Sequence, residues 1–443
     1  MGIVRLSGVH AVEIAARLFV SSKGKDIRKI RQRVFHGHVH DGDGNILDEV
    51  LLHIMRAPHS YTAEDVVEIN AHGGMAPLRA ILEAALAHGA RLAQPGEFTR
   101  RAFVNGRMDL SRAEAVIDLV QAQTRAALHA ANTVAGGALS RALYELRDLL
   151  ADALAHVEAA VDFPEEDLPE LVNEALLERL RNAHKRMTDL IRNADAGILY
   201  REGVSLAIVG KPNVGKSSLF NALLRDARAI VSAQPGTTRD RLEETITLEG
   251  IPARLIDTAG MRSAADEVEA IGVERAKNAA QQAGMILFVV DASAPFSQED
   301  VALAEYLARL AVPVTLVRNK MDLMDGMDKM DAGDILAVKW AAACEVSAIT
   351  GAGLHELEHT LAALLLGDAS RTAEEPMLSR LHQKDSIRRA ATALERLFDN
   401  IDASPEFLAV DLREALQAVG EITGETTPED VLDRIFASFC IGK

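Results

Sequence analysis

The spacing of apolar residues divides the chain into four stretches with different expected structures. The first stretch, up to about residue 108, mixes the short periods of strands with the longer period of helices. A strong turn signal, Asp-Gly-Asp-Gly at 41–44, separates two of its strand candidates. We therefore expect residues 1–108 to form an α+β domain. Its predicted strands are Ile3–Leu6, Val34–Val39, Ile46–Met55 and Val66–Ile69, and its predicted helices are Val9–Val20 and Pro77–His88.

Helical spacing dominates the second and fourth stretches, residues 109–203 and 367–443. Apolar residues recur every three or four positions, as in Leu110, Ala113 and Ile117, and the segment 163–167 interrupts this pattern. Near the end of the chain, Thr427 is predicted to be a helix N-cap, with Pro428 in the first helical position. That helix should run from residue 429 to about residue 439.

In the third stretch, residues 204–366, strand-like and helix-like segments alternate, which is typical of a parallel sheet with helices on both faces. The expected fold is therefore multidomain: the α+β domain, an all-α helical domain in two parts, and an α/β domain inserted between those parts. The strand candidates of the inserted domain are Ser205–Val209, Ala253–Ile256, Met285–Val290 and Val312–Val317.

Composition narrows the class of protein. The 443 residues carry a formal net charge of −17, which argues against a general nucleic-acid binder but leaves room for a local basic patch. Two cysteines cannot form a disulfide framework, which favours a reducing compartment. The longest apolar runs are far shorter than the ~20 residues of a membrane span, and no signal-peptide pattern opens the chain. We expect a soluble, cytoplasmic protein with no membrane partner.

Candidate chemistry is concentrated in the third stretch. Residues 210–217 read G-x-x-x-x-G-K-S between a strand candidate and a helix start, which is the context of a phosphate-binding loop. In such a loop Gly215 lets backbone N–H groups approach the phosphates, Lys216 reaches the β- and γ-phosphates, and Ser217 is a magnesium ligand. The loop residues expected at the nucleotide are Asn213, Val214, Gly215, Lys216, Ser217 and Ser218.

Further motifs follow in the order of a guanine-nucleotide site. Asp257 ends a strand candidate, where it can hold magnesium through water, and Asp322 can accept two hydrogen bonds from guanine that adenine does not offer. Together with the loop, these motifs indicate a P-loop GTPase domain with a Ras-like parallel sheet that binds GTP and Mg²⁺. The additional residues expected at the nucleotide are Asp257, Thr258, Ala259, Gly260, Asn319, Lys320, Asp322, Ser347 and Ala348.

A polar segment at 232–240 occupies the position of a switch loop, with Thr238 as the natural second magnesium ligand. The plainer interpretation is an ordinary polar loop. The nucleotide-contacting residues predicted here are Ser232, Ala233, Gln234, Pro235, Gly236, Thr237 and Thr238.

One expected group is missing from the motifs. Ras-type enzymes orient the attacking water with a glutamine directly after D-x-x-G, and that position here is Met261, which cannot orient water. The chemistry then needs another polar group and another source of positive charge. Asp266, Glu267 and Glu269 are candidates for orienting water, and the alternative is that they are solvated acids at a helix start.

Over nearly its whole length the chain resembles the MnmE family, also called TrmE, of bacterial tRNA uridine-modification GTPases. Segments that other GTPases of the superclass lack carry this resemblance: Gln94–Phe103, Asn105–Ala115, Ala159–Pro164 and Phe436–Lys443. The resemblance implies a homodimer whose GTPase domains pair in a potassium-dependent way, with K⁺ in place of an arginine finger. It also implies that Glu269 orients the water. The implied K⁺ ligands are Asn213, Ser232, Gln234 and Thr237.

The resemblance also implies a role for the N-terminal domain. It would bind a 5-formyl- or methylene-tetrahydrofolate cofactor as one-carbon donor through Arg5, Glu68, Arg107 and Lys443. With the FAD-containing partner MnmG, in a heterotetramer, the family installs a carboxymethylaminomethyl-type group on C5 of the wobble uridine of certain tRNAs. The catalytic residues implied in this chain are Lys216, Glu269 and Cys440.

The role of Cys440 rests on its ionisation. A free cysteine has a pKa of about 8.5 unless a cation lies near, and Lys443 or Arg434 could supply that cation. The alternative is a semi-buried apolar side chain near a helix end. Cys344, beside the guanine-side motif, is expected to be structural.

Two positions depart from the family pattern. The chain begins at Met1-Gly2-Ile3, where family members usually have a further strand and a Pro-Pro-Gly-Arg-Gly-Gly-like loop. We expect this departure to bear on folate affinity and dimer stability. Arg107 stands where lysine is common, and its geometry toward a carboxylate differs.

Two rival functions fit part of the sequence. Residues 204–366 equally resemble Era- or Der-type ribosome-assembly switches, but the flanks show no KH domain, second GTPase domain or basic RNA patch. A regulatory module that hydrolyses GTP poorly would fit Met261, whereas Glu269 argues against it. The alternating His36, His38 and His40 suggest a metal site or, more plainly, a solvated strand face.

Overall fold

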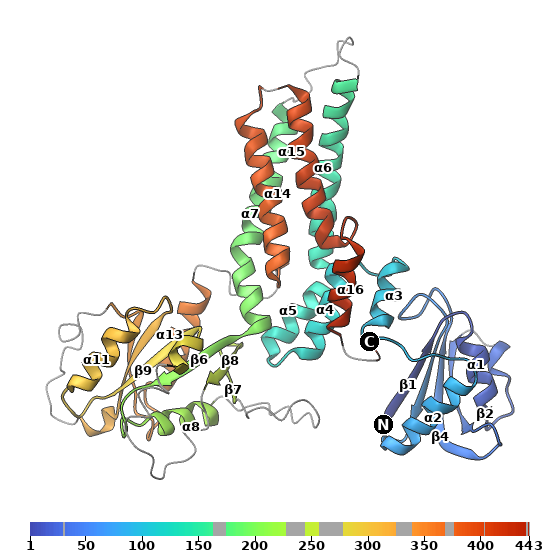
Figure 1. Cartoon of the computed structure of the whole chain (residues 1–443), viewed down its shortest axis with the longest axis horizontal. Coiled ribbons are helices and arrows are strands. Elements are labelled where there is room, and N and C mark those ends of the chain that lie inside the picture. The colour runs from blue at the N-terminus through green and yellow to red at the C-terminus, as the bar shows by residue number, and fades with distance from the viewer. Residues whose placement is uncertain are drawn as a thin grey trace. The chain divides into compact units, whose positions relative to one another are not determined.

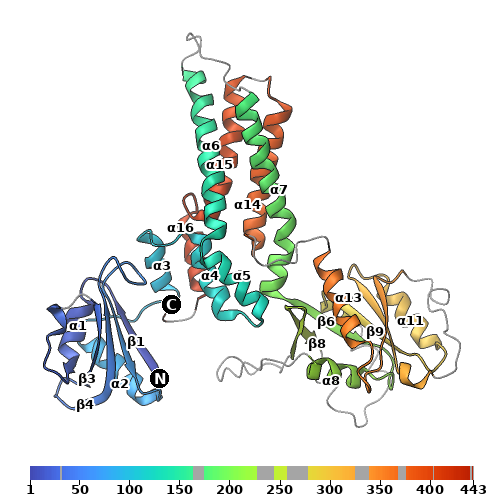
Figure 2. The same ribbon diagram turned by 180° about the vertical axis from the view of Figure 1, so that it is seen from behind.

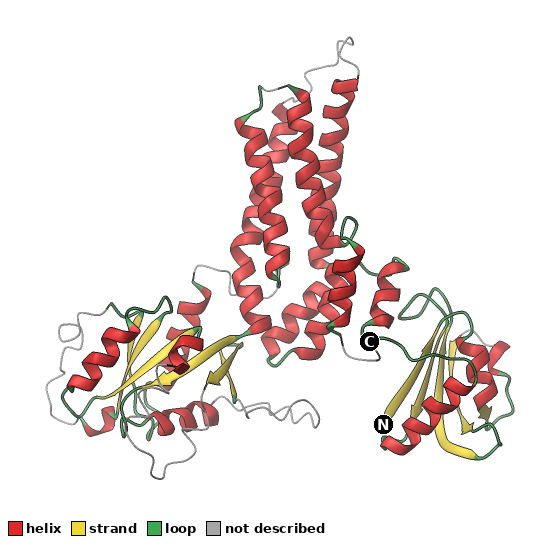
Figure 3. Cartoon of the chain, in the orientation of Figure 1, coloured by secondary structure: helices red, strands yellow, loops and turns green. Residues whose placement is uncertain are grey.

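Figures 1 and 2 show the computed structural model of the chain, and Figure 3 distinguishes its helices, strands and loops. The structure describes residues 1–29, 32–162, 174–226, 244–256, 278–324, 339–367, 376–402, 404–439 and 442. The chain splits into two compact units. The first consists of Met1–Ile117 with Gly420–Lys443, and the second of Asp118–Val419.

An antiparallel sheet with strand order β1-β5-β4-β3-β2 forms the base of the first unit. Alternate strand residues such as Ile54 and Ile69 face a core shared with helices α1 and α2, so one face of the sheet is covered. The elements are β1 Gly2–Ser7, α1 Ala11–Leu18, β2 Phe19–Ser21, the 3₁₀ turn η1 Ile27–Lys29, β3 Gln32–His40, β4 Ile46–Met55, β5 Val66–Ala71 and α2 Met75–Ala87.

The first helix is shorter than its apolar spacing predicts. Helix α1 ends at Leu18, and the next three residues form β2 instead of continuing the helix to Val20. Phe19 has an extended backbone and is buried, and it pairs with Val39 of β3. An aromatic residue followed by valine favours a strand once a neighbouring strand is available, which local periodicity does not reveal.

A second core of the first unit joins helices that are distant in sequence. Helices α3 (Glu97–Val104) and α16 (Glu429–Ala437) pack with the start of α4 (Leu110–Gln121). Phe436 is buried there, with its ring centroid 6.1 Å from that of Phe103. The end of the chain therefore returns to the segment that follows the N-terminal sheet.

The start of α16 corrects the predicted helix cap. Pro428 is the N-cap residue, with extended backbone, and does not lie in the first helical position. The Thr427 hydroxyl instead donates to the carbonyl of Glu421 (2.7 Å), near the end of the preceding helix α15 (Pro405–Thr423). The capping hydroxyl is absent because the previous helix end already uses it.

In the second unit, four long helices lie side by side, namely α6, α7, α14 and α15 (Figures 1 and 2). Ion pairs cross between the early and late helices, including His184 Nε2 to Glu395 (3.0 Å) and Arg413 to Glu158 (2.7 Å). Helices before and after the α/β segment thus form one bundle, which confirms the insertion. The helices are α5 Arg125–Ala135, α6 Ala138–Asp162, α7 Glu174–Glu202, α14 Leu381–Asp399 and α15 Pro405–Thr423.

The inserted α/β segment contains a six-stranded sheet with order β11-β10-β9-β6-β8-β7. All neighbouring strands are parallel except the β7–β8 hairpin, which confirms the Ras-like parallel sheet. The elements are β6 Val204–Val209, α8 Lys216–Asp226, β7 Thr245–Leu248, β8 Ile251–Ile256, β9 Met285–Asp291, α11 Gln298–Leu307, β10 Val314–Asn319, the 3₁₀ turn η2 Met321–Leu323, β11 Ala342–Glu345 and α13 Leu354–Leu366.

Each face of this sheet has its own core. Helices α8 and α13 cover one face, and α11 covers the other. The central strands β9 and β10 are buried along almost their whole length, as expected of parallel strands with helices on both sides. The two strands that apolar spacing missed, β7 and β11, have four residues each and lie at the sheet edges. Strands that short carry too little periodicity to be recognised.

Candidate functional site

The phosphate-loop motif lies between β6 and α8, at the carboxyl end of a parallel strand and at a helix N-terminus. Three of its residues have positive φ: Gly210 (153°), Asn213 (64°) and Gly215 (94°). A Cβ added to Gly215 would come within 2.2 Å of Asn319 Nδ2, so close approach of the guanine-side motif requires glycine there. The backbone geometry of the phosphate loop and the position of the motif at 319–322 therefore depend on each other.

The ammonium group of Lys216 folds back on the loop. Its Nζ donates hydrogen bonds to the carbonyls of Gly210 (2.8 Å) and Lys211 (2.7 Å). Burial lowers the pKa of Lys216 below its ordinary value, because water is excluded from the charged form. Neutral carbonyls are weaker partners for an ammonium than an anion is, so a phosphate oxygen can compete for this group.

Another lysine anchors the loop from outside. Lys211 Nζ lies 2.8 Å from the Asp300 carboxylate, which is almost fully buried at the start of α11. Burial opposes the charge on Asp300, but hydrogen bonds from Lys211 and Ser297 outweigh it and hold the pKa of Asp300 below its usual range. The Lys211 carbonyl, which accepts a hydrogen bond from Lys216, thus belongs to a residue whose side chain is held by the ion pair with Asp300.

Asn319 joins the phosphate loop to the guanine-side loop. Its Nδ2 donates to the carbonyl of Val214 (2.9 Å), and its Oδ1 accepts from the backbone N–H of Ala348 (3.0 Å). The side chain is buried, with 2% exposure. Both of these hydrogen bonds join the Asn319 side chain to backbone groups of the protein. Asn319 is therefore a structural brace between the phosphate loop and the guanine-side loop.

Lys320 and Asp322 follow with different exposures. Lys320 adopts φ 68° and donates from Nζ to Asp291 (2.6 Å), the last residue of β9. Burial would raise the pKa of Asp291, but hydrogen bonds from Lys320 and Ser293 hold it below the usual range. Asp322 is exposed, and one of its oxygens accepts from the Ser347 hydroxyl (2.5 Å). That contact orients the exposed carboxylate.

These residues fit a guanine nucleotide with magnesium. Ser217 follows Lys216 in the first turn of α8 and is only partly buried, so its hydroxyl stays accessible. Magnesium characteristically takes few protein ligands and completes its shell from phosphates and water. Within the described residues, no group of three or more His, Cys, Asp or Glu side chains could hold a metal ion. His36, His38 and His40 therefore do not form such a group.

The structure places one part of the predicted nucleotide site and leaves the other part untested. Asn213, Val214, Lys216, Ser217 and Ser218 lie on the loop and the start of α8. The guanine-side motifs at 319–322 and 347–348 meet the loop through Asn319. The remaining predicted residues fall outside the described part of the chain: Ser232, Ala233, Gln234, Pro235, Gly236, Thr237, Thr238, Asp257, Thr258, Ala259, Gly260, Glu269, Cys440 and Lys443.

A second cluster gathers in the first unit around Arg5. The Arg5 guanidinium pairs with Glu68 on the adjacent strand β5 (2.7 Å) and donates to the carbonyl of Gly442 (3.1 Å). Two of the predicted folate residues are therefore direct neighbours. The chain terminus approaches them from the opposite end of the sequence.

Aromatic rings complete this cluster. The Tyr61 ring has Arg107 5.1 Å and Arg5 5.9 Å from its centroid, and Phe98 lies under Arg5 at 5.7 Å. The Tyr61 hydroxyl is 2.9 Å from Thr99 Oγ1. Sequence reasoning named both arginines but missed Tyr61 and Phe98, because no local spacing links these rings to residues 5 and 107. We refer to Arg5, Tyr61, Glu68, Phe98 and Arg107 as the arginine–aromatic cluster.

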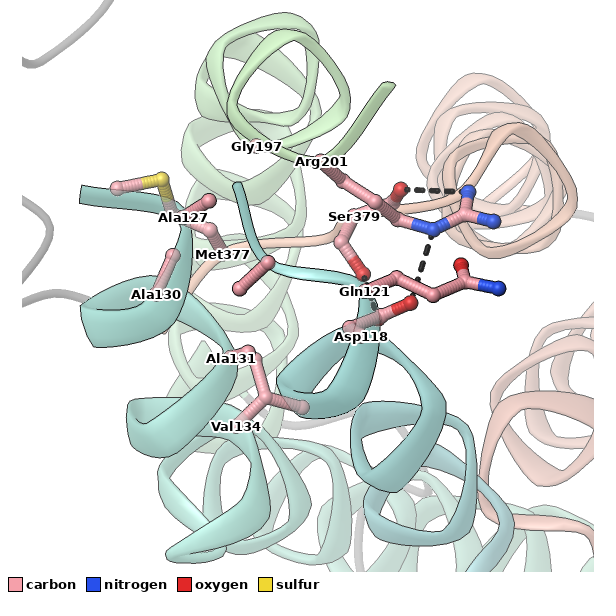
Figure 4. Close-up of a pocket in the computed structure, with 11 residues that line it drawn as sticks. Asp118, Gln121, Ala127, Ala130, Ala131, Val134, Gly197, Arg201, Met377 and Ser379 are labelled. Atoms are coloured by element: carbon pink, nitrogen blue, oxygen red, sulfur yellow. Dashed lines mark hydrogen bonds and ion pairs between the residues drawn. The ribbon is translucent and has the colours of Figure 1, made fainter. Parts of the chain in front are cut away.

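A pocket lies where the bundle meets the connections to the α/β segment (Figure 4). Small apolar residues of α5, including Ala127 and Ala131, form one wall, and Asp118 stands at its polar side. The Asp118 carboxylate pairs with Arg201 (2.9 Å) and Arg380 (2.8 Å). Arg201 precedes the α/β segment in the chain and Arg380 follows it, so one buried carboxylate pairs with residues on both sides of the segment.

Cys344 is 7% exposed, and burial raises the pKa of its thiol, as expected of a structural cysteine. None of the helices in the described part of the chain has the combined length and apolar character that crossing a membrane requires.

Comparisons with known proteins cover the whole chain. The family model of the MnmE helical domain matches residues 110–440, and that of the GTP-binding protein TrmE N-terminus matches residues 1–107. A protein named tRNA modification GTPase MnmE from Alkaliphilus metalliredigens (strain QYMF) is 44% identical over 100% of this chain and 96% of its own length. A second protein of the same name, from Chloroflexus aurantiacus (strain ATCC 29366 / DSM 635 / J-10-fl), is 46% identical over 100% of this chain and 96% of its own length. Among solved structures, the G domain of T. maritima FeoB is 28% identical over 36% of this chain and 98% of that domain, with a TM-score of 0.27.

Proposed function

Because the chain belongs to the MnmE family of tRNA modification GTPases, we propose that it hydrolyses GTP in a potassium-activated reaction that drives modification of the wobble uridine of tRNA. The observation that carries this proposal is the brace at Asn319, whose buried side chain connects the phosphate loop to the guanine-side loop through two hydrogen bonds. A phosphate-binding loop and a guanine-binding motif that are joined in this way are suited to bind a guanine nucleotide.

Within this frame each described residue has a proposed role. The backbone of 213–215 and the start of α8 surround the phosphates, and Lys216 exchanges its carbonyl partners for phosphate oxygens. Ser217 holds magnesium, which neutralises charge on the phosphates when it is bound. Asp322 receives the guanine edge in the orientation that Ser347 imposes. The Asp291 carboxylate holds Lys320 beside the base.

The proposal assigns roles to residues outside the described part as well. Thr238 and Asp257 complete the magnesium side, and Glu269 orients the water in place of the glutamine that Met261 replaces. Potassium is held by Asn213, Ser232, Gln234 and Thr237 in a homodimer, as the family resemblance implies. The exposure of Asn213 supports this, because an exposed residue of the loop is accessible to a cation.

The arginine–aromatic cluster is the proposed folate site. A tetrahydrofolate combines a flat pterin ring with a glutamate tail, and the cluster offers both aromatic faces and guanidinium groups. Arg5, Glu68, Arg107 and Lys443 are the proposed ligands for 5-formyl- or methylene-tetrahydrofolate. Cys440 lies two residues before Gly442, whose carbonyl Arg5 contacts, and that proximity supports a role in the one-carbon chemistry.

We place this reaction in the cytoplasm, with the FAD-containing MnmG protein as partner in a heterotetramer and tRNA as substrate. The product is a carboxymethylaminomethyl-type group on C5 of uridine. The proposed domain division is 1–108, 109–203, 204–366 and 367–443, with the second and fourth segments forming one helical domain.

The deciding experiment compares GTP hydrolysis by the purified chain in KCl and in NaCl at equal ionic strength. A large gain in kcat specific to potassium is expected, with Asn213→Ala removing the gain while Asn400→Ala, a distant exposed control, keeps it. Equal rates in both salts would contradict potassium activation and would favour a conventional switch protein that acts on ribosomal subunits.

A further inference from the structure

The turn between β7 and β8 is attached to the helical domain by a specific hydrogen bond. Thr124, the N-cap of α5, donates from its hydroxyl to the carbonyl of Gly250 (2.7 Å) and accepts from the N–H of Ala127 (3.0 Å). Thr124 is 6% exposed, so its contact with Ala127 is buried, and its contact with the half-buried Gly250 is partly shielded from water. An N-cap normally needs only the accepting contact. The donating contact therefore joins α5 to a turn of the α/β sheet.

Close packing surrounds this hydrogen bond. Gly250 has φ +96°, and a Cβ built on it would come within 2.7 Å of the Ala126 Cβ. Tyr200 of α7 and Ile251 of β8 are buried in an apolar cluster with Leu366 of α13. The turn is thus fitted between α5, α7 and α13 with no space for a further methyl group.

Strand β8 leads from this contact to the phosphate loop. Ile251 directly follows the turn, and Ile256, at the other end of the strand, pairs with Ala207 of β6. Ala207 precedes Gly210, the first residue of the loop motif, by three positions. A six-residue strand spans ~20 Å and transmits displacement along its length because its ladder hydrogen bonds fix its register.

One carboxylate of the helical domain pairs with residues on both sides of the α/β segment. Asp118 of α4 pairs with Arg201, at the end of α7 just before the α/β segment (Figure 4). It also pairs with Arg380, the N-cap residue of α14. Asp118 is 8% exposed. Side chains from both sides of the α/β segment therefore meet at this carboxylate, and the β7–β8 turn makes a separate contact with α5.

We propose that Thr124 is a positioning residue for GTP hydrolysis: helix α5 holds the β7–β8 turn, and through β8 it sets the strand that ends beside the phosphate loop. This inference rests on the proposed GTPase function and extends it to a residue outside the GTPase segment. We also expect this contact to differ between the GTP-bound and GDP-bound states, so that nucleotide exchange at the loop changes the local stability of α5. The stability of α5, a helix of the helical domain, thereby depends on whether GTP or GDP is bound.

Two pairs of variants of the full-length chain test this contact. Thr124→Val removes the hydroxyl and keeps the side-chain shape, whereas Thr124→Ser restores the hydroxyl. Gly250→Ala pushes the turn away from Ala126, whereas Gly89→Ala adds a methyl group at a similar φ (+100°) with no atom within 4 Å. A double variant, Ala126→Gly with Gly250→Ala, removes the methyl group that the new Cβ would meet.

We expect Thr124→Val and Gly250→Ala to lower kcat about 5- to 10-fold with GTP affinity nearly unchanged, the scale of one lost buried hydrogen bond. Thr124→Ser and Gly89→Ala should keep kcat within about twofold of wild type on the same reasoning, and Ala126→Gly should partly rescue Gly250→Ala. A thermal melt of each variant separates lost folding from lost positioning, since a general loss of stability would not be rescued by serine.

Hydrogen exchange gives the second readout. Amides of α5 in the wild-type chain should exchange at different rates with GDP and with a non-hydrolysable GTP analogue, and Thr124→Val should abolish that difference. A wild-type chain that hydrolyses GTP but shows the same α5 exchange with both nucleotides would overturn the inference alone. A chain that binds the two nucleotides with different α5 exchange but does not hydrolyse GTP would support the coupling and contradict the proposed function.

Discussion

The nucleotide site and the arginine–aromatic cluster are built in opposite ways. The nucleotide site takes its residues from loops that follow β6, β9, β10 and β11, which are neighbouring strands of one sheet. The carboxyl ends of parallel strands meet at one edge, so short motifs arrive together whenever the sheet forms. The arginine–aromatic cluster instead gathers side chains from residue 5 to residue 107, with Gly442 from the chain end beside them.

The difference predicts how each site responds to change. The nucleotide site is braced by buried hydrogen bonds to backbone groups, so loss of one brace should disturb several ligands at once. The arginine–aromatic cluster depends on partly exposed cations over rings, which are weaker and more nearly independent contacts. Substitutions should therefore have larger effects at the nucleotide site than at the cluster.

The largest effect should come from Asn319→Ala. Each of its two buried hydrogen bonds is worth about 1–3 kcal/mol once its partner is left unsatisfied, so GTP affinity should fall by about 10²-fold. Titration with a fluorescent GTP analogue measures this. Asn105→Ala is the control, because it loses a single bond to the carbonyl of Thr62 in the first unit and should leave GTP affinity unchanged. An unchanged Kd in Asn319→Ala would end the claim that this brace organises the site.

Glu269→Ala should lower kcat by about 10²-fold while GTP affinity stays nearly intact, the result of losing a group that orients water. Single-turnover hydrolysis at saturating GTP measures it. Asp266→Ala and Glu267→Ala are neighbouring controls that should remain near the wild-type rate. If either control loses as much activity as Glu269→Ala, then the water-orienting role is assigned to the wrong acid.

At the arginine–aromatic cluster, Tyr61→Ala should weaken binding of 5-formyltetrahydrofolate by about tenfold, because the ring that faces both arginines is lost. Tyr61→Phe keeps the ring and loses only the contact with Thr99, so it should bind folate nearly as well as wild type. Isothermal titration calorimetry compares the two, with GTP hydrolysis unchanged in both. Equal losses in the two variants would mean that the hydroxyl, and not the ring, carries the contact.

The last prediction concerns the stability of the first unit and not the binding of a ligand. Hydrogen bonds from Arg91 and then from the Gln94 N–H and Arg101 outweigh burial and lower the pKa of Glu97 to about 2. A carboxyl group whose pKa is lower in the folded state stabilises the fold at pH values above its unfolded pKa, near 4.5. This stabilisation is lost as the pH falls from 4.5 toward 2. Glu97→Gln should therefore unfold about 2 kcal/mol more easily at pH 7, the scale of a hydrogen bond to a charged group.

Denaturant unfolding at several pH values checks this prediction. The difference between wild type and Glu97→Gln should shrink steadily below pH 4.5. Glu83→Gln is the control, since its partner Arg79 is exposed and such surface pairs contribute little. A difference that does not depend on pH would show that the charge of Glu97 plays no part.

The sequence by itself determined the α+β start, the helical flanks and the inserted parallel sheet, because strand and helix periods are local properties of the chain. It also determined the loop at 210–217 and its partners at Asn319 and Ser347, since each motif is contiguous and follows a strand. Local patterns did not determine where short edge strands form, and β2 replaced the expected end of a helix because β3 was there to pair with it.

Only the tertiary structure decided which distant side chains meet. Tyr61 joins the two arginines, Asp300 fixes Lys211, and Thr124 reaches Gly250, although long stretches of chain separate the members of each pair. Single residues of this kind carry no periodicity and no fixed spacing to their partners. Their contacts follow from how whole elements pack, and packing depends on the complete set of buried surfaces and not on any one segment.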